Sequence, residues 1–288
     1  MSPDSALAAS FFALPVWCGL LGMAVGSFLN VVCWRLPKMM ERQWRDECCD
    51  LLGTNTSTEN QPTFNLAFPP SHCPHCRHAI KAWENIPVVS FLLLRGKCAG
   101  CSKAISVRYP LVEVITGVLS AVVAMRFGFT YACLAGLGIT WALLALAIID
   151  ADTGLLPDTI TLPLLWAGLL AATQGLFCTL EAAVFGAVGG YLSLWLAFHA
   201  FKLLTGKEGM GFGDFKLFAA LGAWLGWQQL PLILLLSSAV GATVGLCLIA
   251  FRHHDKQVPI PFGPYLAAAG WISLLWGSDL VNHYIALL

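Results

Sequence analysis

The sequence predicts an all-α polytopic membrane protein with about eight transmembrane helices and a small cytoplasmic, zinc-ribbon-like insertion. Of its 288 residues, 58% are hydrophobic and only 11% are charged, whereas soluble proteins carry about 25% charged residues. Long uncharged runs recur along the chain, and its one long polar stretch contains two C-x-x-C pairs. The first two observations indicate a membrane protein, and the third indicates a metal-binding insertion.

The uncharged runs give the expected helices. Most reach the roughly 20 residues that span a bilayer as a helix. The 217–251 run is too long for one crossing and contains "WQQLP", so we divide it into a short helix and a second one from about residue 231. Eight crossings result, and the sixth has the weakest signal. The runs cover residues 5–34, 109–125 (broken only by Glu113), 127–149, 159–180, 182–201, 217–251 and 257–278.

The basic residues predict the orientation of these helices. The first run lacks the basic start and the A-x-A site of a signal peptide, so we expect it to be a retained span. Counting from it, the segments on one side of the membrane hold every Lys and Arg except Arg126. By the positive-inside rule that side is the cytoplasm, and both termini lie outside. The formal net charge of +0 therefore says little about binding partners. We expect the protein to contact the lipid bilayer and to bind no nucleic acid.

Three parts of the chain follow from this pattern. Residues 1–34 are the first transmembrane helix, residues 35–108 form a cytoplasmic domain, and residues 109–288 form the transmembrane core. The stretch at 41–70 within the cytoplasmic domain has no role that the sequence reveals.

Two C-x-x-C pairs, "CPHC" and "CAGC", predict a metal site in the cytoplasmic domain. They place four cysteines so that each pair can hold one side of a tetrahedral ion, as in zinc ribbons. A reducing cytoplasm argues against disulfides. We expect structural zinc, with an iron centre or free thiols as alternatives, and nearby His72, His75 and His78 as neighbours of the site that do not bind the ion. The ligands are Cys73, Cys76, Cys98 and Cys101.

Acidic residues stand at two membrane edges. "IIDADTGLLPD" contains Asp150, Asp152 and Asp158, and "GMGFGDFK" places Asp214 among glycines. Two crossings separate the motifs, so both lie on the cytoplasmic face and Asp150 can meet Asp214. Paired carboxylates cannot both ionise readily, which suits an aspartic protease. The alternative for the first three acids is a solvated helix end. Gly211 and Gly213 would give the backbone freedom and let another segment approach closely.

Several other polar residues have two interpretations each. Glu113 either pairs with an interfacial base such as Arg108 or serves a substrate or methyl donor. Asn30 and Arg35 either line the same cytoplasmic mouth or, for Arg35, anchor the topology. Lys216 either acts on the acid pair or extends to the interface. The glycines and alanines of 182–190, "AAVFGAVGG", predict close helix packing.

At these motifs the chain resembles the type IV prepilin peptidases, also called prepilin leader peptidase/N-methyltransferases, which are membrane aspartic proteases of the GxGD type. The landmarks are "GSFLNVVCWRLP" at 26–37, the cysteine region through "RYPLVE" at 73–113, "IDADTGLLPD" at 149–158 and "GMGFGDFKL" at 209–217. The resemblance covers nearly the whole chain. It implies that Asp150 and Asp214 are the catalytic acids, whereas Asp152 and Asp158 belong to the motif only.

The resemblance also implies the substrates and the second activity. The substrates would be type IV prepilins and type II secretion pseudopilins, which lose a short basic leader on the cytoplasmic side. The new N-terminal residue would then be methylated using S-adenosylmethionine. The residues that bind this donor are unknown from the sequence, and the cysteine-containing domain with "RYPLVE" is the expected region. The expected location is the bacterial inner membrane, multi-pass, with a cytoplasmic-facing active site.

Two other classes of protein remain open from the residues alone. A transporter or channel could use Asp150 and Asp214 as an ion site, in which case it would cleave nothing. A noncatalytic assembly scaffold held by zinc would not depend on either acid for processing. The sequence gives no information on the oligomeric state.

Overall fold

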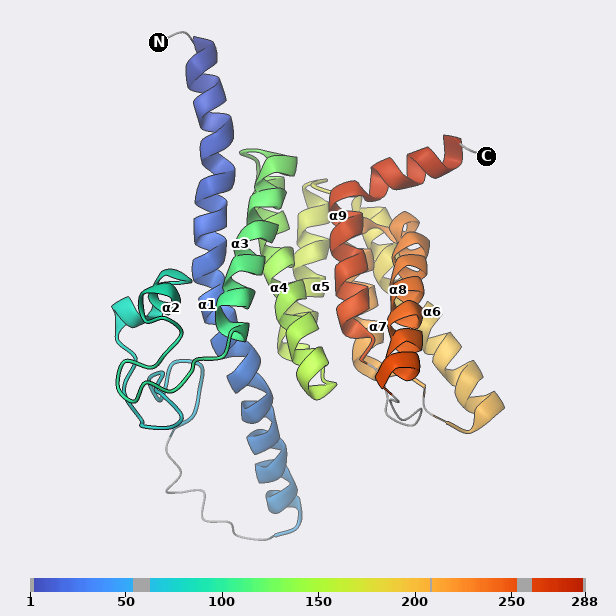
Figure 1. The fold of residues 1–288 in the computed structure, drawn as a ribbon. Coiled ribbons are helices and arrows are strands. Elements are labelled where there is room, and N and C mark those ends of the chain that lie inside the picture. The colour runs from blue at the N-terminus through green and yellow to red at the C-terminus, as the bar shows by residue number, and fades with distance from the viewer. Residues whose placement is uncertain (1–2, 54–62, 208, 253–260, 287–288) are drawn as a thin grey trace. The chain divides into compact units, whose positions relative to one another are not determined.

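The computed structural model describes residues 3–53, 63–207, 209–252 and 261–286 (Figure 1). Helix contacts divide the chain into two compact units, Met1–Gly128 and Phe129–Leu288. No strand occurs among the described residues, where the only β pairing is two isolated bridges near the cysteines. The all-helical fold expected from the sequence is therefore confirmed for the described part of the chain.

Two long helices form the framework of the first unit. Helix α1 (Pro3–Leu51) and helix α3 (Arg108–Phe127) lie side by side. The contact depends on small residues, because a Cβ atom at Gly26 would lie 2.8 Å from Oγ1 of Thr116. Such small-residue contacts are typical of helices that associate in membranes, where close backbone approach maximises packing.

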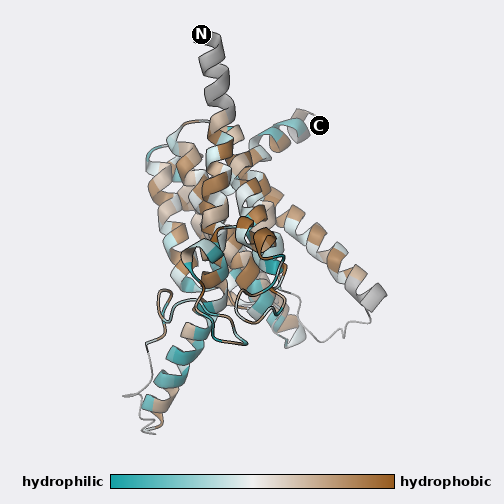
Figure 2. Ribbon diagram, turned by 60° about the vertical axis from the view of Figure 1, so that its left-hand side comes forward, coloured by the Kyte–Doolittle hydropathy of each residue, from teal (hydrophilic) through white to brown (hydrophobic). Residues whose placement is uncertain are grey.

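Helix α1 continues well beyond the first expected span, which ends at residue 34. It is 49 residues long, which corresponds to about 74 Å at 1.5 Å per residue. Figure 2 shows its colour changing from brown to teal along its length, as apolar residues give way to "ERQWRDECCD". The polar part contains an i,i+4 pair in which Nε2 of Gln43 donates to Oε1 of Glu47 at 2.9 Å, a contact that supports an exposed helix. Part of the 41–70 stretch is thus helix.

The rest of the first unit is mostly irregular chain between α1 and α3. It contains the short helices η2 (Ala82–Asn85) and α2 (Val89–Leu93). Arg35 anchors this chain to α1, because its guanidinium donates to the carbonyls of Asn65 at 2.9 Å and Pro69 at 2.6 Å. Arg35 is only 5% exposed, so its role is more specific than the topology anchor considered from the sequence. Residues 54–62 of the 41–70 stretch lie outside the described residues.

The described residues of the second unit form six helices and one short 3₁₀ turn, with α7 in contact with most of the others. Helix α7 contacts α5, α6, α8 and α9, and every residue from Asp214 to Leu225 except Lys216 is buried. A helix that is apolar all round is expected to be buried in this way. The elements are α4 (Tyr131–Thr153), α5 (Asp158–Thr173), α6 (Leu180–Thr205), α7 (Phe212–Leu225), η3 (Trp227–Gln229), α8 (Leu230–Arg252) and α9 (Gly263–Ala286).

Small residues and one tryptophan fix α7 against its neighbours. A Cβ atom at Gly190 of α6 would lie 2.9 Å from the carbonyl oxygen of Phe218 in α7, so the close packing expected for 182–190 is confirmed. On another side, Nε1 of Trp224 donates to the carbonyl of Leu164 in α5 at 2.8 Å. Asp214 therefore stands on a helix that is held from several directions.

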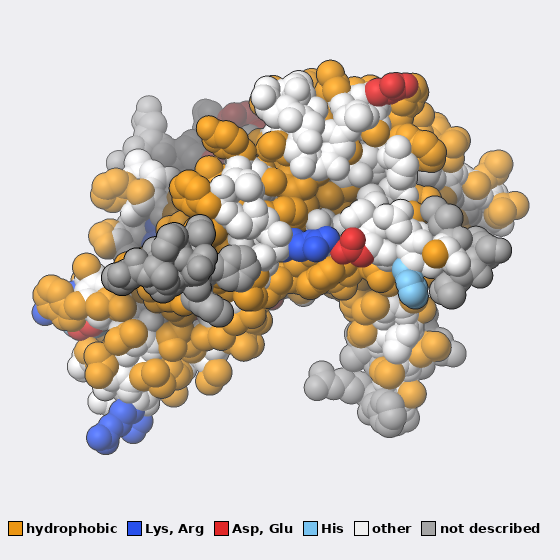
Figure 3. Space-filling model, turned by 90° about the horizontal axis from the view of Figure 1, so that it is seen from above, with side chains coloured by type: hydrophobic (Ala, Val, Ile, Leu, Met, Phe, Trp, Pro, Cys, Tyr) orange, Lys and Arg blue, Asp and Glu red, His pale blue; other side chains and the backbone are white. Residues whose placement is uncertain are grey.

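The helices agree with a membrane protein in length and character. Five helical segments in the described residues are long and apolar enough to cross a membrane, and each of the eight expected crossings overlaps a helix within the described residues. Helix α7 has 14 residues, or about 21 Å, which is less than the ~30 Å hydrocarbon core. Orange hydrophobic side chains cover much of the face shown in Figure 3. The five segments are Ala13–Leu51, Arg108–Phe127, Tyr131–Thr153, Leu180–Thr205 and Trp227–Cys247.

Candidate active site and metal centre

Asp150 lies in the last turn of α4. The helix ends at Gly154, which adopts a left-handed conformation with a φ of 66° and donates its N–H to the carbonyl of Asp150 at 2.8 Å. Glycine is the usual residue at this position because it has no Cβ. The Asp150 side chain is 5% exposed, whereas Asp152 is exposed. The helix end thus turns the first acid of the motif inward.

Asp214 lies in the first turn of α7, three residues after its N-cap residue Gly211. A carboxylate is favoured at a helix N-terminus, where unpaired N–H groups and the helix dipole attract negative charge. Asp214 is 7% exposed, and its Oδ1 atom is buried with no hydrogen-bond partner among the described residues. A buried acceptor without a partner is costly, which points to a functional requirement for this acid.

The second unit brings these two acids together. Asp150 and Asp214 lie close enough to interact electrostatically. Leu156 of the first motif approaches the second motif at Gly213 and the start of α9 at Gly263: a Cβ at Gly213 would lie 2.7 Å from Leu156 Cβ, and one at Gly263 would lie 3.2 Å from its Cδ2. Gly211 has an ordinary φ of −80°, so its backbone does not need the conformational freedom of glycine. At Gly213, the close approach of Leu156 is the reason that a glycine is needed.

Gly263 is a site residue that the sequence analysis missed. It begins α9, and its backbone N–H donates to Oδ2 of Asp150 at 2.9 Å. A Cβ atom there would lie 2.6 Å from the same oxygen. The sequence analysis treated 257–278 only as an apolar run. The "PFGP" segment at 261–264, with a glycine between two prolines at the start of a span, was the available signal.

Asp158 and Lys216 form an ion pair between α5 and α7. Nζ of Lys216 lies 2.8 Å from Oδ1 and 2.6 Å from Oδ2 of Asp158. Asp158 stands at the first position of α5, and Lys216 is two residues beyond Asp214. The lysine is therefore paired with the last aspartate of the motif, an arrangement that neither interpretation of Lys216 included.

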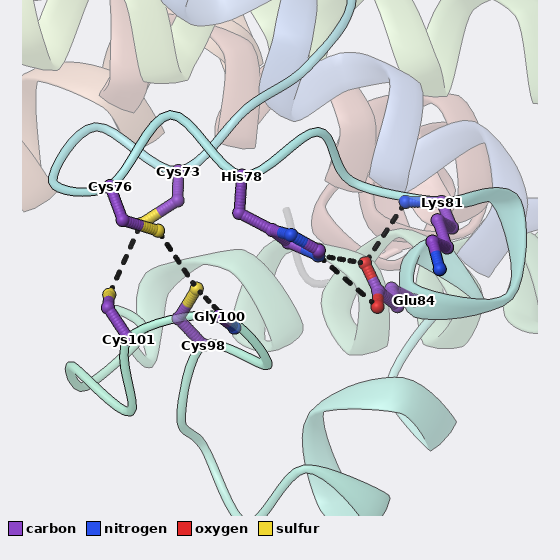
Figure 4. Close-up of polar contacts among 8 residues, drawn as sticks. All are labelled: Cys73, Cys76, His78, Lys81, Glu84, Cys98, Gly100 and Cys101. Carbon is purple, nitrogen blue, oxygen red and sulfur yellow. Dashed lines mark hydrogen bonds and ion pairs between the residues drawn. The ribbon is translucent and has the colours of Figure 1, made fainter.

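The four cysteines of the first unit form one cluster that could hold a metal ion. All four sulfur atoms lie within 4.8 Å of one another. The Sγ atoms of Cys73 and Cys101 are 3.8 Å apart, and those of Cys76 and Cys98 are 3.9 Å apart (Figure 4). Ligands about 2.3 Å from a tetrahedral zinc ion lie about 3.8 Å from each other. The sulfur positions therefore fit such an ion.

Each C-x-x-C pair is built on the same backbone turn. In the first, the N–H of Cys73 donates to the carbonyl of His78 at 2.9 Å, and in the second the N–H of Cys98 donates to that of Lys103 at 2.8 Å. Arg77 and Ser102 occupy equivalent positions with a φ of 58° each. Backbone N–H groups of Cys76 and then His75 lower the pKa of Cys73 to about 6, which favours the thiolate form of that cysteine, whereas burial and the neighbouring thiols raise the pKa of Cys76 to about 12.

His78 binds Glu84 and not the cysteine cluster. Its Nε2 atom lies 3.1 Å from Oε2 of Glu84, which also accepts the N–H of Lys81 at 3.1 Å (Figure 4). The Lys81 N–H, with a contribution from His78, lowers the pKa of Glu84. Nδ1 of His72 lies 3.0 Å from the carbonyl of Pro70. These contacts agree with histidines that are neighbours of the metal site.

A multi-pass membrane protein with a buried pair of acids is the class that this fold and this site define. The chain belongs to the type IV prepilin leader peptidase/N-methyltransferase family. Residues 20–127 match the model of the bacterial peptidase A24 N-terminal domain, and residues 137–246 match that of the type IV leader peptidase family. The resemblance found in the sequence is therefore confirmed.

Curated relatives match over almost the whole chain. A prepilin leader peptidase/N-methyltransferase of Pseudomonas aeruginosa is 59% identical over 92% of this chain and 91% of its own length. That of Aeromonas hydrophila is 56% identical over 92% of each chain. That of Stutzerimonas stutzeri is 53% identical over 99% of this chain and 98% of its own. No solved structure gives a significant match to the chain.

Proposed function

We propose that this protein is a membrane aspartic endopeptidase that removes the leader from prepilins and pseudopilins and methylates the new N-terminal residue. The family carries both activities in its name. The observation that supports the peptidase most directly is the meeting of Asp150 and Asp214 at buried helix ends of one unit. An ion site of a transporter would use the same acids, but the family membership favours peptide cleavage.

The acid pair supplies the proton chemistry of cleavage. Two carboxylates at close range share one proton, because both cannot ionise readily. The ionised acid takes a proton from a water molecule, which attacks the scissile carbonyl, while the protonated acid polarises the carbonyl oxygen. Gly263 holds one oxygen of Asp150 through its N–H, whereas Oδ1 of Asp214 has no hydrogen-bond partner among the described residues and so remains available for the shared proton.

The position of the acids suits a substrate that itself spans the membrane. Asp150 lies at the end of one helix and Asp214 at the start of another, so both stand near a membrane boundary. A prepilin whose apolar helix lies in the bilayer presents its leader junction at that depth. We assign this boundary to the cytoplasmic face of the bacterial inner membrane, with eight crossings, because of the distribution of Lys and Arg.

Methylation requires a donor, for which we propose S-adenosylmethionine. When bound, it supplies an electrophilic methyl group to the amine that cleavage exposes. We place this activity with residues 35–108 and the start of α3, since these carry the irregular, polar part of the chain. The domain division of the sequence analysis, 1–34, 35–108 and 109–288, is retained as a proposal alongside the two compact units.

For the metal we propose structural zinc bound by Cys73, Cys76, Cys98 and Cys101. Four thiolates close the coordination sphere of a tetrahedral ion, so no position is open for a substrate. The two matched turns each present a pair of sulfurs, and the ion joins them. Its free energy of binding would stabilise this part of the unit.

Incubation of purified protein with a prepilin tests the function. With S-adenosylmethionine present, mass spectrometry should show a shortened pilin carrying one added methyl group; without it, the pilin should be shortened only. Asp150→Asn and Asp214→Asn should each abolish cleavage while the protein keeps its metal. Retained cleavage in both variants would refute the acid pair, and absence of any cleavage by the parent protein would refute the peptidase assignment.

A further inference from the structure

A cavity of about 540 Å³ opens in the first unit between α1, the start of α3 and the cysteine-containing segment. Its volume falls within the 300–1,000 Å³ of pockets that bind small molecules and cofactors. All of its lining residues lie between Ser27 and Glu113, within a single compact unit. The acid pair is in the other unit and has no part in it.

The walls of the cavity combine carboxylates with aromatic rings. Glu84 and Glu113 supply the carboxylates, and Trp34, Phe91 and Tyr109 supply the rings. Glu113 is only 8% exposed. The buried Arg35 also lines the cavity, but its guanidinium donates to the carbonyls of residues 65, 66 and 69. Lys103 and three histidines line it as well. The composition favours a ligand with a flat ring and charged groups of both signs, since rings and carboxylates attract cations and Lys103 attracts a carboxylate.

Glu113 also holds a strained part of the backbone beside the cavity. Its Oε2 atom accepts the N–H of Val88 at 2.8 Å, and Val88 has a φ of 60°. A positive φ is an outlier for a β-branched residue and persists only where the surroundings enforce it. Helix α2 begins directly after Val88 and places Ser90 and Phe91 at the cavity. The strained conformation of Val88 thus helps to determine the shape of one wall of the cavity.

The cysteine cluster supports another wall. Cys73 and Cys98 line the cavity, as does His78, which binds Glu84. An ion bound by the four sulfurs would fix this wall relative to α1 and α3. A metal site with no open position and a cavity next to it together suggest that the ion shapes a binding site rather than taking part in chemistry.

A second cavity, in the other unit, offers no comparable chemistry. It has about 360 Å³, and Tyr191 is its only polar lining residue. A charged ligand could not be matched there, because burying an unpaired charge is costly. Its lining residues are Leu165, Ala187, Val188, Tyr191, Leu192 and Ala219.

We propose that the cavity between α1, α3 and the cysteine segment binds the methyl donor, with Glu113 as its central carboxylate. S-adenosylmethionine has a flat adenine ring, a sulfonium and an ammonium group, which match the rings and carboxylates of the walls. This proposal rests on the proposed methyltransferase function. It assigns residues to a binding site that the sequence left unknown, and it places that site in a different unit from the acid pair.

Isothermal titration of the purified full-length protein with S-adenosylmethionine, in the absence of pilin, tests the site. Glu113→Gln should weaken binding at least about tenfold, because a hydrogen bond or contact to a charged group is worth about 1.5–3 kcal/mol. Glu181→Gln, in the first turn of α6 and outside the cavity, is the matched control and should bind as the parent does.

A second variant keeps the test decisive if Glu113→Gln disturbs the fold. Ser27→Trp fills the cavity from α1, whereas Leu20→Trp changes an exposed position of the same helix outside the cavity. Ser27→Trp should abolish measurable binding and Leu20→Trp should not. Normal binding by both Glu113→Gln and Ser27→Trp would overturn the site. If the parent protein still cleaves and methylates prepilin in that case, only the location is wrong and the proposed function stands.

Discussion

The two units hold their functional groups in different ways. In the second unit, Asp150 and Asp214 stand on regular helices whose contacts run through glycines and one tryptophan. In the first unit, the four cysteines and the cavity walls stand on irregular chain, held by Arg35, by Glu113 and by the proposed ion. Helix packing and one backbone N–H, that of Gly263, position the acids, whereas the cavity depends on individual side-chain contacts and on the proposed metal. The two activities should therefore fail separately.

Outside the acid pair itself, replacement of Gly263 should have the largest effect on the second unit. In Gly263→Val the new Cβ would lie 2.6 Å from Oδ2 of Asp150, so the acid or the start of α9 must move. Displacement of a catalytic group by about 1 Å costs about 100-fold in rate. We expect a loss of that order in prepilin cleavage, measured by initial rates, with metal content unchanged.

Gly189→Ala is the control for this substitution. Gly189 lies on α6, and a Cβ there would have no neighbour within 4 Å. It should cleave at the parent rate. If Gly263→Val also cleaved at that rate, the contact between α9 and Asp150 would not be part of the site.

Removal of one sulfur should affect the first unit instead. Cys98→Ser leaves three of the four thiolates of the cluster, which lowers its affinity for the metal. The cavity wall that Cys98 forms is then held less firmly. Most of the metal should be lost, as measured by elemental analysis, and S-adenosylmethionine binding should fall with it.

Cys247→Ser, a cysteine on α8 outside the cluster, serves as the matched control and should keep its metal. Metal content that stayed at the parent level in Cys98→Ser would contradict the four-thiolate site.

The ion pair of Lys216 and Asp158 should matter least. Both side chains are partly exposed, at 31% and 51%, and such pairs contribute about 0–1 kcal/mol. Lys216→Met should therefore reduce cleavage by about fivefold or less, through a small shift of α7 relative to α5.

The double variant Lys216→Asp with Asp158→Lys should recover part of that loss, measured as the cleavage rate beside each single variant. A loss in Lys216→Met as large as that of Asp214→Asn would mean that the lysine acts in catalysis itself.

Much of this architecture could be predicted from the sequence. Uncharged runs gave the helices, because a bilayer demands long apolar segments. The spacing of Cys73, Cys76, Cys98 and Cys101 gave the cluster, since two short turns suffice to present four sulfurs. Both patterns can be recognised in short stretches of sequence, so neither requires knowledge of the tertiary structure.

The contacts that could not be predicted are those between distant segments. Gly263 contacts Asp150 through a backbone N–H. Because almost every residue has this group, the residue type does not reveal the contact. The Arg35 contacts to the carbonyls of the 65–69 segment are likewise backbone contacts. The end of α1 could not be predicted for a different reason: a loss of hydropathy marks the end of a membrane span, but the helix continues to Leu51 through residues that favour helix in water.

One measurement tests the separation of the two activities most directly. Asp214→Asn protein is incubated with S-adenosylmethionine and either intact prepilin or a pilin that already lacks its leader, and the products are weighed by mass spectrometry. We predict that the prepilin stays uncut and that the leaderless pilin gains one methyl group. Cleavage of the prepilin by this variant, or failure to methylate the leaderless pilin although the donor still binds, would contradict the account.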